Sequence, residues 1–279
     1  MNKLLKGNYL RLFHNKIFWL SVLAVIVCCL YEINQGIVYL EAGFHMVTLD
    51  EHYFYIGPLA ALFLSVFIPM FIGVEYSFGT IRNKLTIGHT RDKIYISIFL
   101  SCLTGTVIIL AAWFAAGLTG IPKLGLWRSG ISAISTKFIV TILYSIALTA
   151  IFTFFSVLIT GRSVSVVFQI VLALVIILSG SMLYNRLCEP EVIRSMEIIN
   201  GELEVGEPEP NPMYIGGITR KICVAIINIL PSGQAILLLH GDLTNNVPKL
   251  IPLQIISSVL ITLVFTAAGI ILFRKKDLK

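Results

Sequence analysis

The chain has 279 residues, of which 57% are hydrophobic and only 13% are charged, and its mean hydropathy is +0.89. This composition excludes an ordinary soluble globular domain and indicates a multi-pass membrane protein. The net charge of +6 does not indicate a nucleic-acid-binding protein, because the basic residues lie scattered at the ends of apolar runs rather than in one stripe.

Residues 1–15 predict an amphipathic helix that lies at the membrane interface. Apolar residues recur there at helical spacing, with basic residues between them: Leu4, Leu5, Tyr9, Leu12 and Phe13. The apolar run that follows has no small-residue cleavage pattern after it, so we expect an uncleaved first span. This span extends from Lys16 to Tyr31, and the apolar residues up to Leu40 allow a longer one.

Further apolar runs are long enough to cross a bilayer: Tyr53–Val74, Tyr95–Ile121, Phe138–Thr160, Val164–Tyr184 and Leu250–Phe273. With the first span they predict an all-α integral membrane fold of six helices, forming a single transmembrane domain over residues 1–279. Only three residues, 161–163, separate the fourth span from the fifth, so we expect these two to form a tight antiparallel pair.

The loop between the second and third spans, residues 75–93, is polar and basic, as expected of a cytoplasmic loop. Ile81 and Leu85 are four residues apart and predict a short amphipathic helix. Gly88 is placed to end that helix, and Thr90 is placed to cap the next one. These features alone fit a solvated basic connector equally well.

Residues 185–249 form the largest polar insert, and its first half is acidic. The segment Glu197–Val205 alternates around Asn200-Gly201, which predicts a β-hairpin. The apolar stretch Lys221–Gly241 is interrupted by polar residues and Pro231, and predicts a re-entrant or interface-lying helical pair. A full seventh span is the alternative, but it would place the C-terminus outside.

With this topology, thirteen of the 21 lysines and arginines lie on the side of the 75–93 loop. The positive-inside rule therefore predicts that both termini are cytoplasmic and that the 185–249 insert is extracellular.

The sequence contains no phosphate-binding loop, HExxH motif or GxSxG motif, so we assign no catalytic residue and no cofactor. His45, Asp50, Glu51 and His52 share one outer loop, but their spacing is not diagnostic of a metal site, and we expect none. Cys188 and Cys223 lie on one side in this topology, where a disulfide is an open alternative. The chain is not expected to be an enzyme, and any energy source must come from another subunit.

The chain resembles type-2 ATP-binding-cassette (ABC) permeases in its overall pattern of an interface helix and six spans. The most specific part of the resemblance is the stretch from Glu75 to Tyr95, E-x3-GTIRNKL-x2-G-x-TRDKIY. The tail FRKKDLK, from Phe273 to Lys279, is similar to that family's C-terminus. The resemblance implies a coupling helix that docks on a separate ATPase subunit, formed or supported by Glu75, Gly79, Thr80, Ile81, Arg82, Lys84, Leu85, Gly88 and Arg91. Glu75 is expected to pair with Arg82, Lys84 or Arg91.

The resemblance also implies the partners: two copies of the ATPase subunit and a second permease subunit, identical or homologous, in a bacterial cell membrane. The leading hypothesis is the permease of an ATP-driven exporter that moves an amphipathic peptide, antibiotic or lipid outward, as in resistance to antimicrobial peptides. The alternative is a non-transporting membrane anchor or sensor that recruits an ATPase. A membrane-embedded hydrolase is disfavoured, since the spans lack paired catalytic groups.

Overall fold

The structure is a computed structural model and describes residues 2–43, 48–125, 130–199, 202–239 and 247–276. Within these ranges, six helices are long and apolar enough to cross a membrane, which confirms the prediction of a helical multi-pass membrane fold. They are α2 (Lys16–Glu41), α4 (Ile56–Ser77), α6 (Arg91–Gly117) with its continuation through η1 (Leu118–Gly120) and α7 (Ile121–Leu124), α8 (Ile131–Leu158), α9 (Arg162–Cys188) and α12 (Ile251–Lys275).

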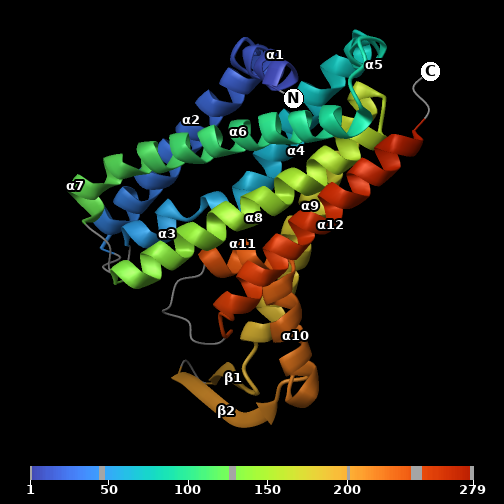
Figure 1. The fold of residues 1–279 in the computed structure, drawn as a ribbon. Helices are drawn as coiled ribbons and strands as arrows, with labels where there is room; N and C mark the ends of the chain where they lie inside the picture. Colours follow the sequence, from blue (N-terminus) through green and yellow to red (C-terminus); the bar gives the residue numbers. More distant parts are fainter. Residues whose placement is uncertain (1, 44–47, 126–129, 200–201, 240–246, 277–279) are drawn as a thin grey trace.

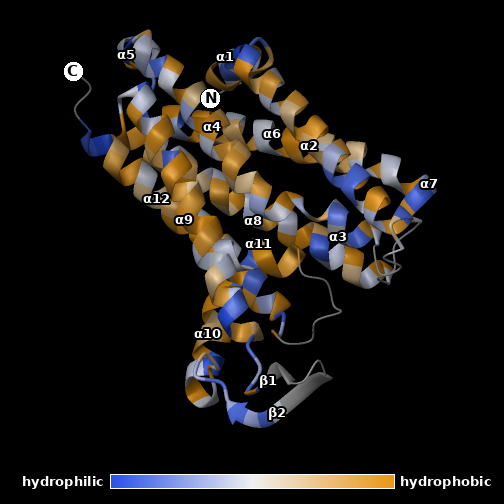
Figure 2. Ribbon diagram, turned by 180° about the vertical axis from the view of Figure 1, so that it is seen from behind, coloured by the Kyte–Doolittle hydropathy of each residue, from blue (hydrophilic) through white to orange (hydrophobic). Residues whose placement is uncertain are grey.

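The core of the bundle lies between α4, α6 and α8. In the apolar middle of these helices 61–72% of the residues are buried, compared with 17% in α9 and α12. Large side chains fill this core, including Phe67, Trp113, Tyr144 and Phe152. Helices α2, α9 and α12 are largely hydrophobic (Figure 2) and expose leucine, isoleucine and valine side chains, as expected of helices that contact lipid.

The prediction that the fourth and fifth spans form a tight pair is wrong. Helix α8 packs chiefly on α12, whereas α9 packs on α4 and on the short helix α11 (Pro231–Leu239). Ile159 and Gly161 have extended backbone conformations, so the two helices diverge after the connection. Gly180 lets α9 approach α11, because a Cβ there would lie 2.4 Å from the carbonyl oxygen of Ser232.

The first and fourth spans show the largest differences from their predicted bounds. The first span continues to Glu41, so the longer alternative is correct. Helix α8 begins at Ile131, seven residues before the predicted start, and Lys137 therefore lies inside it. Lys137 is only 8% exposed, and its ammonium lies 5.6 Å from the centre of the Phe54 ring. The electron-rich face of an aromatic ring attracts a cation, so this contact stabilises the buried ammonium. Phe54 follows a short helix, α3 (Leu49–Tyr53), that precedes α4.

Helices α1 (Asn2–Phe13) and α5 (Thr80–Thr86) and the C-terminal end of α12 lie at one end of the bundle (Figure 1). We call this the N/C end. The opposite end carries a two-stranded antiparallel sheet of β1 (Val192–Ile199) and β2 (Glu202–Pro210), and we call it the hairpin end. Ile199 pairs with Glu202, so the hairpin is confirmed and is longer than predicted. The predicted turn residues Asn200 and Gly201 lie outside the described residues.

The predicted helical pair is also present, as α10 (Gly217–Ile229) and α11, which meet at an angle of 90°. By length and composition the pair is either a re-entrant loop or a seventh span. Cys188 and Cys223, near this pair, are separate thiols that pack against the same small apolar cluster.

A network of neutral side chains joins the bent pair to α12, and we call it the amide elbow: Asn228, Gln234, Gln254, Ser257 and Ser258. Asn228 Oδ1 accepts hydrogen bonds from Leu250 N and Gln254 Nε2, each at 2.8 Å. Gln234 Nε2 donates to Ser257 Oγ at 2.9 Å, and Gln234 Oε1 accepts from Ser258 Oγ at 2.8 Å. These bonds fix the angle between α10, α11 and α12.

Candidate functional site

The loop between α4 and α6 folds as its sequence predicts. Gly79 and Gly88 have φ values of +64° and +93°, a left-handed conformation that favours glycine, and they bracket α5. Thr80 Oγ1 donates to the carbonyl of Glu75 at 3.1 Å, and Thr90 Oγ1 accepts from Lys93 N at 3.5 Å to cap α6. A short helix is therefore held between two sharp turns at the N/C end.

Glu75, at the end of α4, is completely buried and is neutralised by two cations. Lys84 Nζ on α5 donates to Glu75 Oε1 at 2.6 Å, and the Arg11 guanidinium on α1 forms an ion pair with the same oxygen. Lys84 Nζ also donates to Asn8 Oδ1 at 2.9 Å. We call these four residues, Asn8, Arg11, Glu75 and Lys84, the charged junction, since they join α1, α4 and α5.

The charged junction lacks several hydrogen-bond partners. Within the described part of the chain, Glu75 Oε2 and the Nε and Nη2 atoms of Arg11 are buried without one. The Arg11 guanidinium lies over the Phe71 ring at 4.1 Å. Burial lowers the pKa of Lys84, and the nearby Glu75 carboxylate acts in the opposite direction.

Of the three partners that the sequence left open for Glu75, only Lys84 forms the ion pair. Arg82 is exposed on α5. Arg91 instead donates to the carbonyls of Phe273 at 3.0 Å and Arg274 at 2.9 Å, at the end of α12. The loop is therefore attached to α1 on one side and to α12 on the other.

The C-terminal end of α12 is fixed by contacts with three other helices, α4, α6 and α8. Arg274 Nε donates to Asp92 Oδ1 on α6 at 2.6 Å. Lys276 Nζ donates to the carbonyls of Val157 at 2.5 Å and Leu158 at 2.9 Å, and lies 4.5 Å from the centre of the Tyr76 ring. This second set of contacts stabilises the N/C end next to the charged junction.

Ile81 and Leu85, the amphipathic pair of the predicted helix, do not form an exposed apolar edge in the described part of the chain. Ile81 is 2% exposed and belongs to the core of the bundle, and Leu85 packs against that core. A helix of seven residues buries its apolar face against α4 and α6. The large apolar side chains left exposed around α5 are Phe78, at 75%, and Ile87, at 76%.

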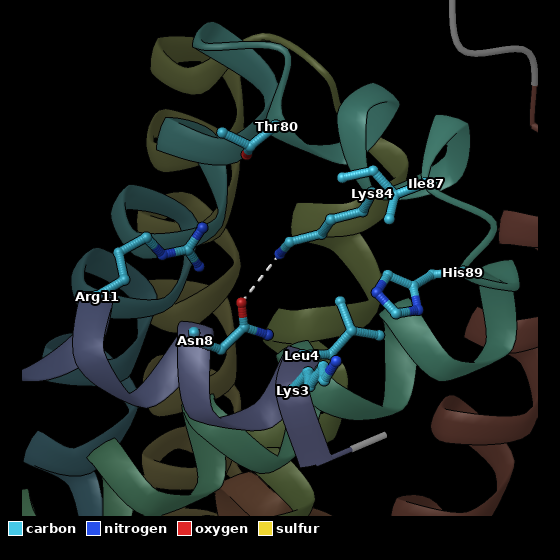
Figure 3. A pocket seen from close by; sticks show the side chains of 9 residues that line it. Lys3, Leu4, Asn8, Arg11, Thr80, Lys84, Ile87 and His89 are labelled. Carbon is cyan, nitrogen blue, oxygen red and sulfur yellow. Dashed lines mark hydrogen bonds between the residues drawn. The ribbon is translucent and has the colours of Figure 1, made fainter.

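A cavity of about 280 Å³ lies between α1 and α5 (Figure 3). Asn8 and Arg11 extend into it from α1, and Lys84 and His89 extend into it from the α5 side. The remaining lining residues are Lys3, Leu4, Gly7, Thr80 and Ile87. The cavity is therefore bordered by several nitrogen donors and by apolar carbon.

Sequence reasoning missed the contribution of α1 to this site. It predicted one apolar face, but the buried face of α1 is Leu4, Asn8 and Leu12, each four residues apart, while Leu10 and Phe13 are exposed on another face. An asparagine in a buried apolar row needs a hydrogen-bond partner, and Asn8 Nδ2 donates to Ser97 Oγ on α6 at 3.0 Å. The four-residue spacing was the signal that would have identified Asn8.

The described residues contain no group of three or more metal-ligating side chains close enough to bind an ion. Of the loop residues considered above, His45 lies outside the described residues, and so does the side chain of Glu51. His52 lies 3.9 Å from Glu32, and burial lowers the pKa of its imidazole.

A comparison of the chain with protein-family models and with curated proteins gives no match.

Proposed function

We propose that this chain is the membrane-spanning permease subunit of an ATP-driven exporter of the type-2 ABC class, with α5 as the helix that contacts a separate ATPase subunit. The observation that carries the proposal is the construction of the N/C end. Helix α5 is held by a buried ion cluster through Lys84, while Arg82 on α5 and Phe78 in the turn before it are exposed. A rigid helix with one free face suits a docking element.

The charge distribution supports a cytoplasmic position for α5. The N/C end carries the basic residues of α1, of the 75–93 loop and of the end of α12, and this side holds thirteen of the chain's 21 lysines and arginines. In a bacterial cell membrane this end would face the cytoplasm, where ATP is available. Two permease chains and two ATPase subunits would form the exporter, and an amphipathic substrate would leave through the bilayer-embedded part.

Co-purification with the ATPase encoded nearest to this gene tests the proposal. The amount of ATPase recovered with the double variant Phe78→Asp/Arg82→Asp should fall at least tenfold. The variant removes the exposed aromatic side chain of Phe78 and reverses the charge at position 82 nearby. Ile131→Asp is the matched control. Ile131 is also exposed, at 85%, but it is the first residue of α8 and lies at the end of that helix away from the N/C end. Equal recovery from both variants would contradict the proposed docking face.

Transport measurements separate the exporter from a non-transporting anchor. Vesicles that contain both subunits should accumulate or release an amphipathic peptide in an ATP-dependent manner, and vesicles with the double variant should not. ATPase binding without any ATP-dependent movement across a panel of peptides and lipids would favour the anchor.

A further inference from the structure

We propose that the cavity between α1 and α5 binds the phosphate of an anionic phospholipid headgroup. The lining places three cations, Lys3, Arg11 and Lys84, around one hollow, against a single carboxylate, Glu75, which is buried behind them. The site therefore has a net positive charge, and it holds donors that match phosphate oxygens.

Unused hydrogen-bonding capacity supports an anionic ligand. Lys84 Nζ donates to Glu75 and Asn8, which leaves one of its three N–H groups available. The Nε and Nη2 atoms of Arg11 have no partner among the described residues. A phosphate in the cavity would accept hydrogen bonds from Lys84 and Arg11. These bonds would offset the free-energy cost of burying hydrogen-bond donors without a partner.

The position of α1 places the cavity at the depth of lipid headgroups. On the side away from the bundle, α1 exposes Leu10 at 54% and Phe13 at 45%, and they border a second, apolar hollow with Leu5 and Tyr9. Trp19 follows at the start of α2 and donates from Nε1 to the carbonyl of Phe13 at 2.7 Å. An amphipathic helix with exposed apolar residues and a neighbouring tryptophan lies in the membrane interface.

The walls favour a lipid over free phosphate. Leu4, Gly7 and Ile87 line the hollow beside the cations, and Ile87 is 76% exposed. The glycerol and first methylene groups of a lipid would cover this apolar surface, whereas an inorganic ion would leave it in water. The volume of about 280 Å³ is close to the lower limit of ligand pockets and suits a small headgroup.

The test measures lipid binding to the purified full-length chain in detergent by native mass spectrometry. The probes are short-chain phosphatidylglycerol, phosphatidylcholine and inorganic phosphate. Lys3→Gln should weaken phosphatidylglycerol binding about fivefold, the effect of one surface cation near an anionic lipid. Lys6→Gln is the matched control, because Lys6 is on the same helix but borders the other hollow.

Gly7→Leu tests the cavity without a change of charge. Gly7 lines the hollow, and a Cβ there would have open space around it, so a leucine side chain would fill the site. Leucine also favours helix over glycine, so α1 should remain folded. We expect this variant to lose the preference for phosphatidylglycerol over phosphatidylcholine, with an unchanged melting temperature.

Three results would overturn the proposal. One is equal phosphatidylglycerol affinity of the Lys3→Gln and Lys6→Gln variants. Another is wild-type lipid preference in Gly7→Leu. The third is displacement of phosphatidylglycerol by inorganic phosphate at comparable concentration, which would identify an ion site rather than a lipid site. None of these measurements depends on ATPase binding, so they stand apart from the proposed function.

Discussion

The charged junction and the amide elbow are both buried polar clusters, but they are built differently. In the elbow every member is neutral, and within the described chain none of its buried side-chain nitrogen or oxygen atoms lacks a hydrogen-bond partner. In the junction a buried carboxylate has two cations on one oxygen, while its other oxygen and two arginine nitrogens have no partner among the residues that the structure describes. A neutral network whose hydrogen bonds are all formed specifies one geometry. An ionic cluster with unpaired hydrogen-bonding atoms can still interact with a charged or polar group that comes close to it.

Their surroundings differ in the same sense. The elbow is closely packed, since a Cβ on Gly233 would lie only 1.9 Å from the carbonyl oxygen of Ile227. The junction adjoins a cavity of about 280 Å³. We therefore interpret the elbow as a fixed structural corner and the junction as the part of the molecule that responds to lipid and to a partner subunit.

Removing the charge of Glu75 should have the largest effect on stability. Glu75→Gln leaves the Arg11 and Lys84 cations close together without a counter-charge, which should cost about 3 kcal/mol of unfolding free energy. Denaturation of the purified protein in mixed detergent micelles measures this loss. The elbow should remain intact, so proteolysis near α10 should not change.

A triple replacement sharpens the comparison. In Glu75→Leu/Arg11→Met/Lys84→Met the whole ionic cluster becomes apolar, and such replacements are often neutral or stabilising. We expect this variant to be more stable than Glu75→Gln and to lose the preference for anionic lipid. If Glu75→Gln is as stable as the wild type, the ionic contacts do not hold α5 in place.

At the elbow, Gly233→Ala should destabilise the chain by about 1–3 kcal/mol through overpacking, because the nearby carbonyl belongs to the backbone and moves little. Gly130→Ala is the control, since a Cβ there has no atom of the described residues within 4 Å, its chain neighbours aside. The same denaturation experiment measures both. A Gly233→Ala protein with wild-type stability would show that the elbow is not closely packed.

The smallest expected effect concerns Lys276, which lies beside the junction at the end of α12. Burial lowers the pKa of Lys276 from 10.5 to about 8, so above pH 8 the unfolded chain holds this proton more tightly than the folded one. Stability should therefore rise with pH between about 8 and 10.5, by about 1–2 °C in melting temperature. Lys276→Gln should remove this contribution, and Lys275→Gln should retain it.

The spans and the local turns were predictable from the sequence because they depend on short-range patterns. Long apolar runs gave the helices, Gly88 and Thr90 marked the ends of two of them, and the Asn-Gly pair marked the hairpin. The extension of α8 to Ile131 was missed because Lys137 resembled a boundary residue. Lys137 is buried beside the Phe54 ring, which is far away in sequence.

Long-range pairings were not predictable. The partner of Glu75 among Arg82, Lys84 and Arg91 was undetermined, and Arg11 was not considered at all, because α1 is distant in the chain and becomes adjacent only in the fold. Similarly, Ile81 and Leu85 showed an amphipathic pattern, but periodicity does not say whether the apolar face contacts another subunit or the chain's own core.

The central claim is that the exposed side of the α5 region contacts an ATPase subunit, and site-specific photocrosslinking in intact membranes tests it directly. A benzoylphenylalanine at position 78, which preserves the aromatic character of Phe78, should form an adduct with the mass of this chain plus the ATPase. The same probe at position 131 should form none, since Ile131 is the first residue of α8, at the end of that helix away from Leu158 and the N/C end. Absence of the adduct at position 78, or equal adducts at both positions, would contradict the account.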